Sequence, residues 1–340
     1  MESFETIEAS RAVPDPERYK KIDEKNRTSF LMVEGSPLRV VQSLYSVGVS
    51  REVLSEEIAK TNDDEKAEEL KDKRQLINGN MSPLNKYGPS ELTPEQRIED
   101  AKNNVHEFLD KQNIDIADVR LLLPERDYDT PLTVINLDET PLVQDDTDLL
   151  RPDKRADMLY TYDPTIIMAA RPADCPIAYV TAETPKGEVT VLIHLATLGV
   201  AHGYVPQAKQ ILDNLDVEWS SVRVQLTPGG HAETYKYENF PDYNPAEKFP
   251  ETSTLYVNIE ETKTDKGERA WNFDVDVAAE AYKQIVEKWN IDEYQVYLDT
   301  TDTTSPESGY SSNSRAFKGY EVDGDNTRDL VLAARRRLAN

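Results

Sequence analysis

The feature that most constrains the fold is a series of four short apolar segments in the middle of the chain, separated by prolines. They cover residues 158–161, 165–170, 177–181 and 189–194. Runs of four to eight apolar residues bounded by turn residues are typical of buried strands. The turns between them are too short for parallel crossovers. We therefore expect neighbouring strands here to be antiparallel or to lie in different sheets.

Helical and strand patterns alternate in the rest of the chain. Thr93-Pro94-Glu95 predicts a helix start, with a threonine N-cap, proline at the first position and an acid in the first turn, and the pattern ends near Asn113. Further helices are predicted at 206–215, 277–289 and 327–338, and further strands at 38–47, 119–123, 132–137, 222–226, 255–259 and 294–298. Interspersed strands and helices indicate an α+β (mixed α/β) fold with mixed and antiparallel sheets.

The N-terminal segment differs in composition from the rest of the chain. Residues 1–36 are charged, contain two prolines and show little periodicity, so we predict an acidic tail or irregular extension. Residues 37–340 are then a single domain. Within it, the highly charged segment 52–74 is a surface helix or a solvated insertion, and the tyrosine-rich segment 235–243 is a packed loop.

The charge balance argues against anionic partners. With 64 acidic and 39 basic residues, the formal net charge is -25, which repels nucleic acids and anionic membranes. The densest basic run, 335–337, is interpreted as the end of the C-terminal helix, where cations interact favourably with the helix dipole. We expect neither nucleic acid nor membrane as a partner.

The cysteine count indicates a reducing compartment. Cys175 is the one cysteine, which excludes an intrachain disulfide framework and a multi-thiolate zinc site. The N-terminal residues lack the apolar region of a secretory signal, and the apolar stretch 189–205 is interrupted by two histidines and two glycines. We expect a cytoplasmic protein.

Several catalytic signatures are absent from the sequence. It contains no phosphate loop, dinucleotide glycine fingerprint, HExxH or GxSxG motif. His231-Ala232-Glu233 matches the H-x-E half of a zinc deaminase site, but that site needs two cysteines downstream. We reject that interpretation.

Cys175 and His194 form the most informative pair. Cys175 lies in the turn between the predicted strands 165–170 and 177–181, and His194 is the last residue of the following strand, 189–194. Both side chains are therefore expected at one end of a sheet. A thiolate kept reactive by an imidazole, or a Cys/His metal pair, would need this arrangement. Taken alone, a lone cysteine is more often a small buried apolar residue. Asp174 is expected to accept backbone hydrogen bonds, and His202 to pack within a turn.

These residues suggest a family. The blocks Ala156-Asp157-Met158-Leu159-Tyr160-Thr161 and Ala173-Asp174-Cys175-Pro176, with Pro164 between them, resemble the "ADALVT…P…ADC-P" stretch of the laccase-domain proteins, formerly called multicopper polyphenol oxidases. The segment from His194 to Gly199 resembles the family's "HAGWRG". Thr227-Pro228 with Tyr235 resembles its "GP…Y" loop. Residues 312–315 and 327–328 resemble its "SyRR" and "GR" elements more weakly.

The resemblance implies a layered α/β/β/α sandwich and a zinc site, with copper as the alternative metal. It also implies phosphorolysis of adenosine, inosine or guanosine, or deamination of adenosine, with a purine nucleoside and phosphate as partners. Cys175 and His194 carry over as metal ligands and, with Asp174, as catalytic residues.

The sequence departs from the family pattern in two places. The family's first histidine should fall within 124–130, which contains Asp127 but no histidine, so Asp127 is the predicted third ligand. Asp129, His202 and His231 are alternatives. Thr197 and Leu198 replace the family's tryptophan and arginine, removing a guanidinium suited to phosphate.

Three functions are compatible with these residues. The first is a purine nucleoside phosphorylase or deaminase with a Cys/His zinc site. The second is a catalytically degenerate relative that acts as a binding or structural protein. The third is a metal-free cysteine hydrolase with Cys175 as the nucleophile and His194 as the base.

Overall fold

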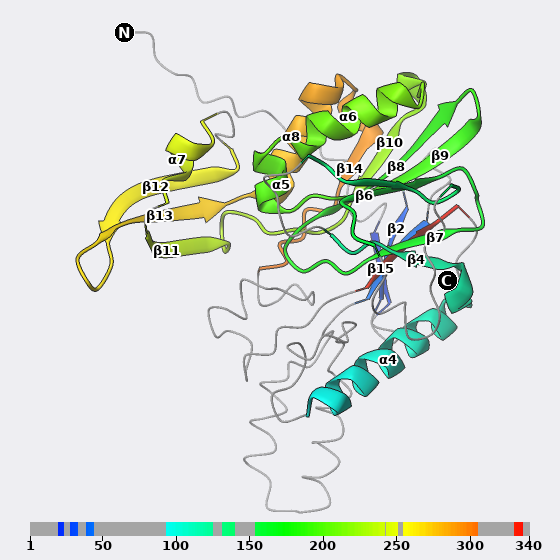
Figure 1. Ribbon diagram of the computed structural model, residues 1–340, viewed down its shortest axis with the longest axis horizontal. Helices are drawn as coiled ribbons and strands as arrows, with labels where there is room; N and C mark the ends of the chain where they lie inside the picture. The colour runs from blue at the N-terminus through cyan, green and yellow to red at the C-terminus, as the bar shows by residue number, and fades with distance from the viewer. Residues whose placement is uncertain are drawn as a thin grey trace, which may run out of the picture.

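The computed structural model (Figure 1) describes residues 20–23, 28–32, 39–43, 93–124, 131–139, 154–241, 243–250, 254–304 and 330–335. The charged segment 52–74 lies outside these residues, as do Asp127 and Asp129. The fold consists of two six-stranded sheets, helices on each outer side, and a smaller sheet that projects from the body.

The two large sheets are mixed. The first has the order β1 (Lys20–Asp23), β2 (Thr28–Met32), β3 (Arg39–Ser43), β15 (Val331–Ala334), β7 (Ile167–Ala170) and β4 (Val119–Leu121). The second has the order β14 (Val296–Leu298), β10 (Arg223–Leu226), β8 (Ile177–Thr184), β9 (Gly187–His194), β6 (Met158–Thr161) and β5 (Val134–Asn136). The pairs β4–β7, β5–β6 and β10–β14 are parallel.

The helices divide between the two outer faces. The first sheet is covered by α4 (Pro94–Lys111), and the second by α5 (Thr197–Ala201), α6 (Tyr204–Asn214) and α8 (Val277–Trp289). Single 3₁₀ turns lie at η1 (Ile116–Asp118), η3 (Trp219–Ser221) and η4 (Glu293–Gln295). In the described part of the chain, none of the helices combines the length and apolar character that a bilayer crossing requires.

Three apolar cores separate the layers. Along β7, Ile167 and Ala169 face α4, whereas Met168 and Ala170 face the second sheet. Along β9, Val191 and its alternate neighbours face the helices, and Leu192 faces the first sheet. Because both faces of β7 are buried, its sequence is continuously apolar. The order helix, sheet, sheet, helix confirms the layered α+β fold.

The central strands confirm the expectation of antiparallel neighbours or a change of sheet. Strand β8 pairs antiparallel with β9, and β9 pairs antiparallel with β6. Strand β7 instead belongs to the first sheet, so the short loop 171–176 passes from one sheet to the other. The predicted helices at 93–113, 206–215 and 277–289 correspond to α4, α6 and α8. Asp276 caps α8 by accepting a hydrogen bond from the backbone N–H of Ala279 at 2.9 Å.

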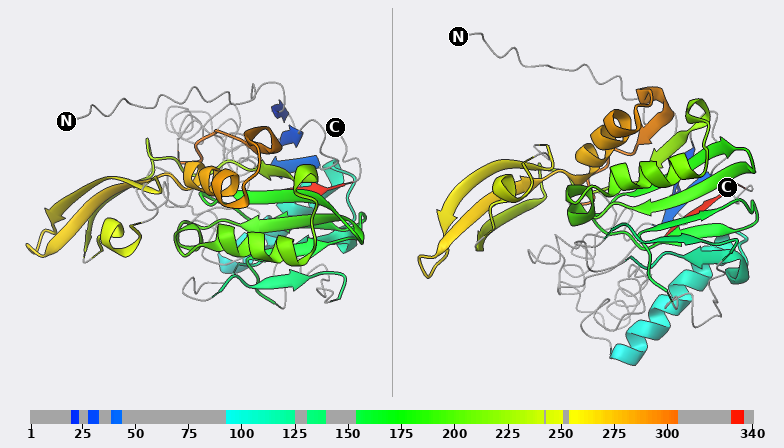
Figure 2. Two further views of the ribbon diagram at one scale, coloured as in Figure 1. Left: turned by 90° about the horizontal axis from the view of Figure 1, so that it is seen from above. Right: turned by 45° about the horizontal axis from the view of Figure 1, so that its top comes forward.

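A third sheet projects from the body and is called the arm (Figures 1 and 2). It consists of β11 (Lys236–Pro241), β13 (Arg269–Val275) and β12 (Tyr256–Lys263), in that order, with the short helix α7 (Pro245–Lys248). Its aromatic side chains contact one another, with Phe273 stacked on Tyr237 at 5.1 Å between ring centroids. The prediction of a packed loop at 235–243 was therefore wrong, because strand β13 pairs with most of that segment.

The predicted C-terminal helix at 327–338 was also wrong. Residues 331–334 form β15, which lies between β3 and β7 and is buried on both faces. Pairing on both sides outweighs the helix preference of leucine and alanine. Arg335 then bonds the carbonyl oxygens of Glu188 and Tyr162 and the carboxylate of Glu188, so it does not complement a helix dipole.

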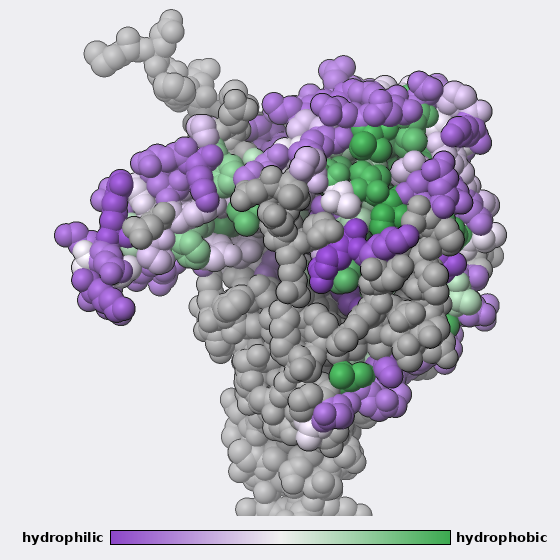
Figure 3. Space-filling model, viewed as in Figure 1, coloured by the Kyte–Doolittle hydropathy of each residue, from purple (hydrophilic) through white to green (hydrophobic). Residues whose placement is uncertain are grey.

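At the N-terminus, β1 and β2 lie within the segment expected to be a tail, and they pair with β3. The domain boundary at residue 36 stays a prediction. The described surface of the helices α6 and α8 and of the arm is largely hydrophilic in the view of Figure 3, as the high charge content of the chain leads one to expect.

Candidate functional site at one end of the second sheet

Several strands of the second sheet begin or end at the same side. Ile177, the first residue of β8, is paired with His194, the last of β9. Leu226, the last residue of β10, lies beside Ala178 of β8 and Leu298, the last of β14. The loops before β8 and after β9, β10 and β14 therefore meet at this side, which we call the site end.

The structure brings Cys175 and His194 to the site end. The backbone N–H of Leu195 donates to the carbonyl of Pro176 at 3.0 Å, which joins the two loops next to these residues. The His194 side chain is buried, and its backbone N–H donates to the carbonyl of Asp157 at 2.9 Å. Cys175 is half-buried. The strand register places His194 on the face that carries Leu192, toward the first sheet.

Asp174 is one of the most enclosed carboxylates at the site end, at 2% exposed. Its carboxylate accepts a hydrogen bond from the Thr303 hydroxyl at 3.2 Å, and its backbone carbonyl accepts one from Gly230 at 2.8 Å. The loop that carries Cys175 is thus attached both to the turn after β10 and to the loop after β14.

Two tyrosines from the base of the arm lie beside this loop. The hydroxyls of Tyr235 and Tyr237 are 3.3 Å apart. Burial raises the pKa of Tyr235 well above 10, and the nearby Tyr237, Asp174 and Cys175 add to that rise. Burial also raises the pKa of Tyr237, so both phenols are neutral hydrogen-bonding groups near the thiol. Gly230 is required here because a Cβ at this position would collide with the Tyr235 ring.

Arg171 begins the loop that carries Cys175. Desolvation by burial lowers its pKa to about 9, because removal from water penalises the charged guanidinium. Sequence reasoning did not single out this residue.

His231 forms an ion pair that sequence reasoning also did not identify. Its Nδ1 lies 3.2 Å from Oδ1 of Asp276, the N-cap of α8. Burial acts to lower the pKa of His231, but the hydrogen bond and charge of Asp276, helped by Asp302 and Glu233, outweigh it and raise the pKa above 6.5. Burial likewise acts to raise the pKa of Asp276, and His231 holds it below 3.8.

The structure describes two of the four candidates for the third metal ligand, His202 and His231. Asp127 and Asp129 lie outside the described residues. His231 is paired with Asp276, and the His202 ring packs edge-on against Phe249, 5.0 Å between centroids. Among the described residues, no group of three or more His, Cys, Asp or Glu side chains is arranged to hold a metal ion.

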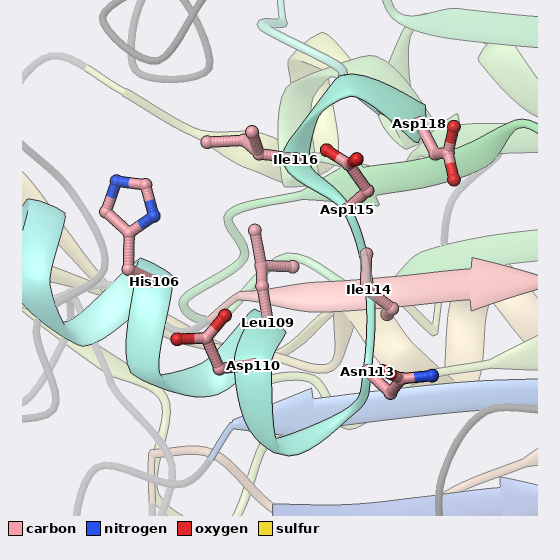
Figure 4. Close-up of a pocket in the computed structure, with 8 residues that line it drawn as sticks. All are labelled: His106, Leu109, Asp110, Asn113, Ile114, Asp115, Ile116 and Asp118. Carbon is pink, nitrogen blue, oxygen red and sulfur yellow. The ribbon is translucent and has the colours of Figure 1, made fainter.

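A cavity of about 440 Å³ lies elsewhere, at the C-terminal end of α4 and around η1 (Figure 4). Its lining includes His106, Asp110, Asp115 and Asp118. It belongs to the helix layer over the first sheet, so it is separate from the site end.

No family model matches the sequence, and a search of curated proteins finds no match. Solved structures do match it. The hypothetical protein YfiH of Bacillus licheniformis is 14% identical over 94% of this chain and 99% of its own, with a TM-score of 0.59. The chain has the fold of the laccase-domain proteins. YlmD of Geobacillus stearothermophilus is 15% identical over 91% and 96% of the two chains, with a TM-score of 0.57. NMB0706 of Neisseria meningitidis, assigned to DUF152, is 16% identical over 90% and 98%, with a TM-score of 0.54.

The laccase-domain fold confirms the architecture that the sequence resemblance implied. At these identities it establishes the fold and leaves the activity to be tested. Thr197 and Leu198, at the positions of the tryptophan and arginine in the resembling motif, lie at the start of α5, where Leu198 is 38% exposed. A large apolar side chain therefore replaces the family's arginine at a surface position next to the site end.

Proposed function

We propose that this chain is a purine nucleoside-processing enzyme whose site is the site end of the second sheet. The proposal is supported by a fold shared with laccase-domain proteins over more than nine-tenths of their length, and by the pairing of His194 with Ile177, two residues after Cys175. The proposed reactions are phosphorolysis of adenosine, inosine or guanosine, and deamination of adenosine.

The two reactions differ in what attacks the nucleoside. In phosphorolysis, a phosphate oxygen bonds to the ribose carbon as the glycosidic bond breaks, and the purine nitrogen gains a proton. In deamination, water adds to the purine carbon and ammonia leaves. Both require proton movement, which we assign to Asp174 together with Cys175 and His194. Asp174 suits this role because its carboxylate is enclosed and lies near two phenols.

The described residues fit a zinc ion only in part. A catalytic zinc needs three protein ligands, and Cys175 and His194 supply two of the right type. Asp127 is the proposed third. Because the described part of the chain offers no complete ligand group, we derive no catalytic step from a metal.

Product analysis tests the proposed activity. Purified full-length protein is incubated with adenosine, inosine or guanosine, with and without phosphate, and the products are separated by chromatography. Free base formed only with phosphate indicates phosphorolysis, and inosine formed from adenosine indicates deamination. Failure to turn over any of the three nucleosides would contradict the proposal.

Metal analysis tests the cofactor separately. We expect bound zinc, or copper as the alternative, in the wild-type protein. Loss of the metal in Asp127→Ala would identify the third ligand, because removing a ligand weakens binding whether or not the protein is active. Equal metal content in wild type and Asp127→Ala would rule out Asp127 as a ligand.

A degenerate relative is the second candidate. It is favoured by the absence of a complete ligand group among the described residues and by Leu198 in place of arginine. It predicts that Cys175→Ala matches the wild type in metal content and in nucleoside binding, measured by calorimetry. A loss of either property in this variant would exclude it.

A cysteine hydrolase is the third candidate, favoured by a half-buried Cys175 that lies two residues before Ile177, the strand partner of His194. It predicts that alkylation of Cys175 by iodoacetamide is faster than that of a model thiol, and that His194→Ala abolishes the excess. Alkylation no faster than a model thiol would exclude it.

A further inference from the structure

The turn after β10 holds the Cys175 loop in place by hydrogen bonds on both sides of Cys175. The N–H of Gly230 donates to the carbonyl of Asp174 at 2.8 Å. Thr227 and Ile177 bond each other twice, through the Thr227 N–H at 3.0 Å and the Thr227 hydroxyl at 2.9 Å. The position of this turn therefore fixes the position of the loop.

The same turn is held on its other side by side chains from two distant elements. Asp302, after β14, accepts hydrogen bonds from the backbone N–H of His231 at 3.2 Å and from the Thr234 hydroxyl at 2.5 Å. Asp276, at the start of α8, pairs with the imidazole of His231 at 3.2 Å. The second contact differs from the first because its strength depends on a charge that is gained and lost near neutral pH.

The surroundings of His231 make that charge effective. Its side chain is 18% exposed and that of Asp276 is 22% exposed, so solvent screens the pair incompletely. Asp276 and Asp302 face the imidazole from α8 and from the loop after β14, and Glu233 acts from its own turn. All three groups are acidic, so each favours the protonated imidazole.

We propose that His231 and Asp276 form a charge-dependent clasp that positions the loop carrying Cys175. His231 is here a positioning residue, because it acts on the thiol through the turn and the Asp174 carbonyl. The clasp concerns the geometry of the site end. It rests on the proposed function only in taking Cys175 as a catalytic residue.

The pH range of the clasp follows from the two shifts. The pKa of Asp276 is lowered, so the stabilisation that its negative charge gives the pair is complete above the ordinary aspartate pKa of 3.8. The pKa of His231 is raised, so the stabilisation that its protonated imidazole gives the pair is complete below the ordinary histidine pKa of 6.5. This stabilisation is lost as pH rises through the raised pKa. The clasp is therefore closed below about pH 6.5 and opens as pH rises through the raised pKa of His231.

The test is the alkylation rate of Cys175 by iodoacetamide, which is specific because the chain has one cysteine. Asp276→Asn is the main variant, since asparagine caps helices as well as aspartate does but carries no charge. The ratio of variant to wild-type rate cancels the pH dependence that both proteins share. We expect a ratio of roughly three to ten below pH 6.5, and this ratio should fall toward one as pH rises and His231 loses its proton.

Two further variants and a control complete the design. His231→Gln should raise the rate as much as Asp276→Asn, and the double variant should raise it no further, because either change opens the same clasp. Asp115→Asn is the matched control, since Asp115 caps η1 through Ala117 and is far from this turn.

A ratio of one at every pH, or an elevated ratio that does not fall as pH rises, would overturn the clasp. The second result would mean that Asp276 acts on the loop through something other than its charge pair with the imidazole of His231. The labelling rate does not depend on turnover, so failure of the clasp and failure of the nucleoside activity are separate outcomes.

Discussion

Thr227 is a residue whose role becomes visible only in the folded chain. Its side chain is fully buried, and its hydroxyl accepts the backbone N–H of Ile177 at the start of β8. A buried N–H left without a partner costs about 1–3 kcal/mol. The threonine therefore stabilises the start of the strand that comes after Cys175.

Thr227→Val removes this acceptor while keeping the shape of the side chain. We expect it to lower the free energy of unfolding by about 1–3 kcal/mol, measured by urea denaturation. Thr165→Val, at an exposed threonine whose hydroxyl bonds Asp163 at 2.7 Å, is the control and should change it by less than about 0.5 kcal/mol. Equal effects of the two changes would contradict this role for Thr227.

At this scale the sequence predicted part of the site. The sequence predicted that Cys175 and His194 lie at one end of a sheet, because a short motif and one hairpin connect them, and their role stays a prediction. The His231–Asp276 pair was not predicted. The two residues are 45 positions apart in the sequence and meet only because α8 packs beside the turn after β10. That the Asp174 side chain accepts backbone hydrogen bonds stays a prediction, and its contact with the Thr303 hydroxyl was not predicted because it depends on the position of the loop after β14.

Among the elements, those with one buried face or strong end signals were predicted best. Helix α8 has its aspartate cap, an apolar face and an asparagine in the left-handed conformation at its end, and its predicted bounds agree with the structure. Strand β15 was mistaken for a helix because its residues are apolar without alternation, and only its neighbours β3 and β7 decide its conformation.

The arm gives a prediction about local stability. Phe273 is 4% exposed and packs against Tyr237, Phe240, Tyr243 and Tyr256, whereas Phe240 is 40% exposed. We expect Phe273→Ala to destabilise the arm by about 3–5 kcal/mol. Phe240→Ala is the matched control and should cost about 1 kcal/mol or less.

Hydrogen exchange locates the effect of these changes. Phe273→Ala should increase exchange in β11, β12 and β13 more than in β8 and β9, because Phe273 contacts the aromatic rings of the arm, which projects from the body in Figure 1. A uniform increase across all five strands would show that the arm does not open independently.

For the whole molecule, the sequence indicated the class of fold from mixed strands and helices. The layered arrangement came from the family resemblance, because no local pattern states which sheet faces which helices. The three cores supply the physical reason, since both faces of β7 and β9 are buried and must be covered.

The net charge of -25 gives a prediction for the molecule as a whole. Like charges at the surface repel one another and destabilise the compact state, and salt screens this repulsion, with a Debye length of about 10 Å at 0.1 M and about 3 Å at 1 M. We expect the melting temperature to rise between these two salt concentrations at neutral pH. A melting temperature that falls in sodium chloride would show that attractive pairs such as Arg335–Glu188 outweigh the repulsion.

The most direct test of the proposed function compares phosphate-dependent cleavage of inosine, together with deamination of adenosine, in wild type and Cys175→Ala. Thr165→Val serves as a folded control with a change far from the site end. We expect turnover by the wild type and the control, and a loss on the order of 100-fold or more in Cys175→Ala. Equal turnover in all three proteins, or none in the wild type, would contradict the proposed function.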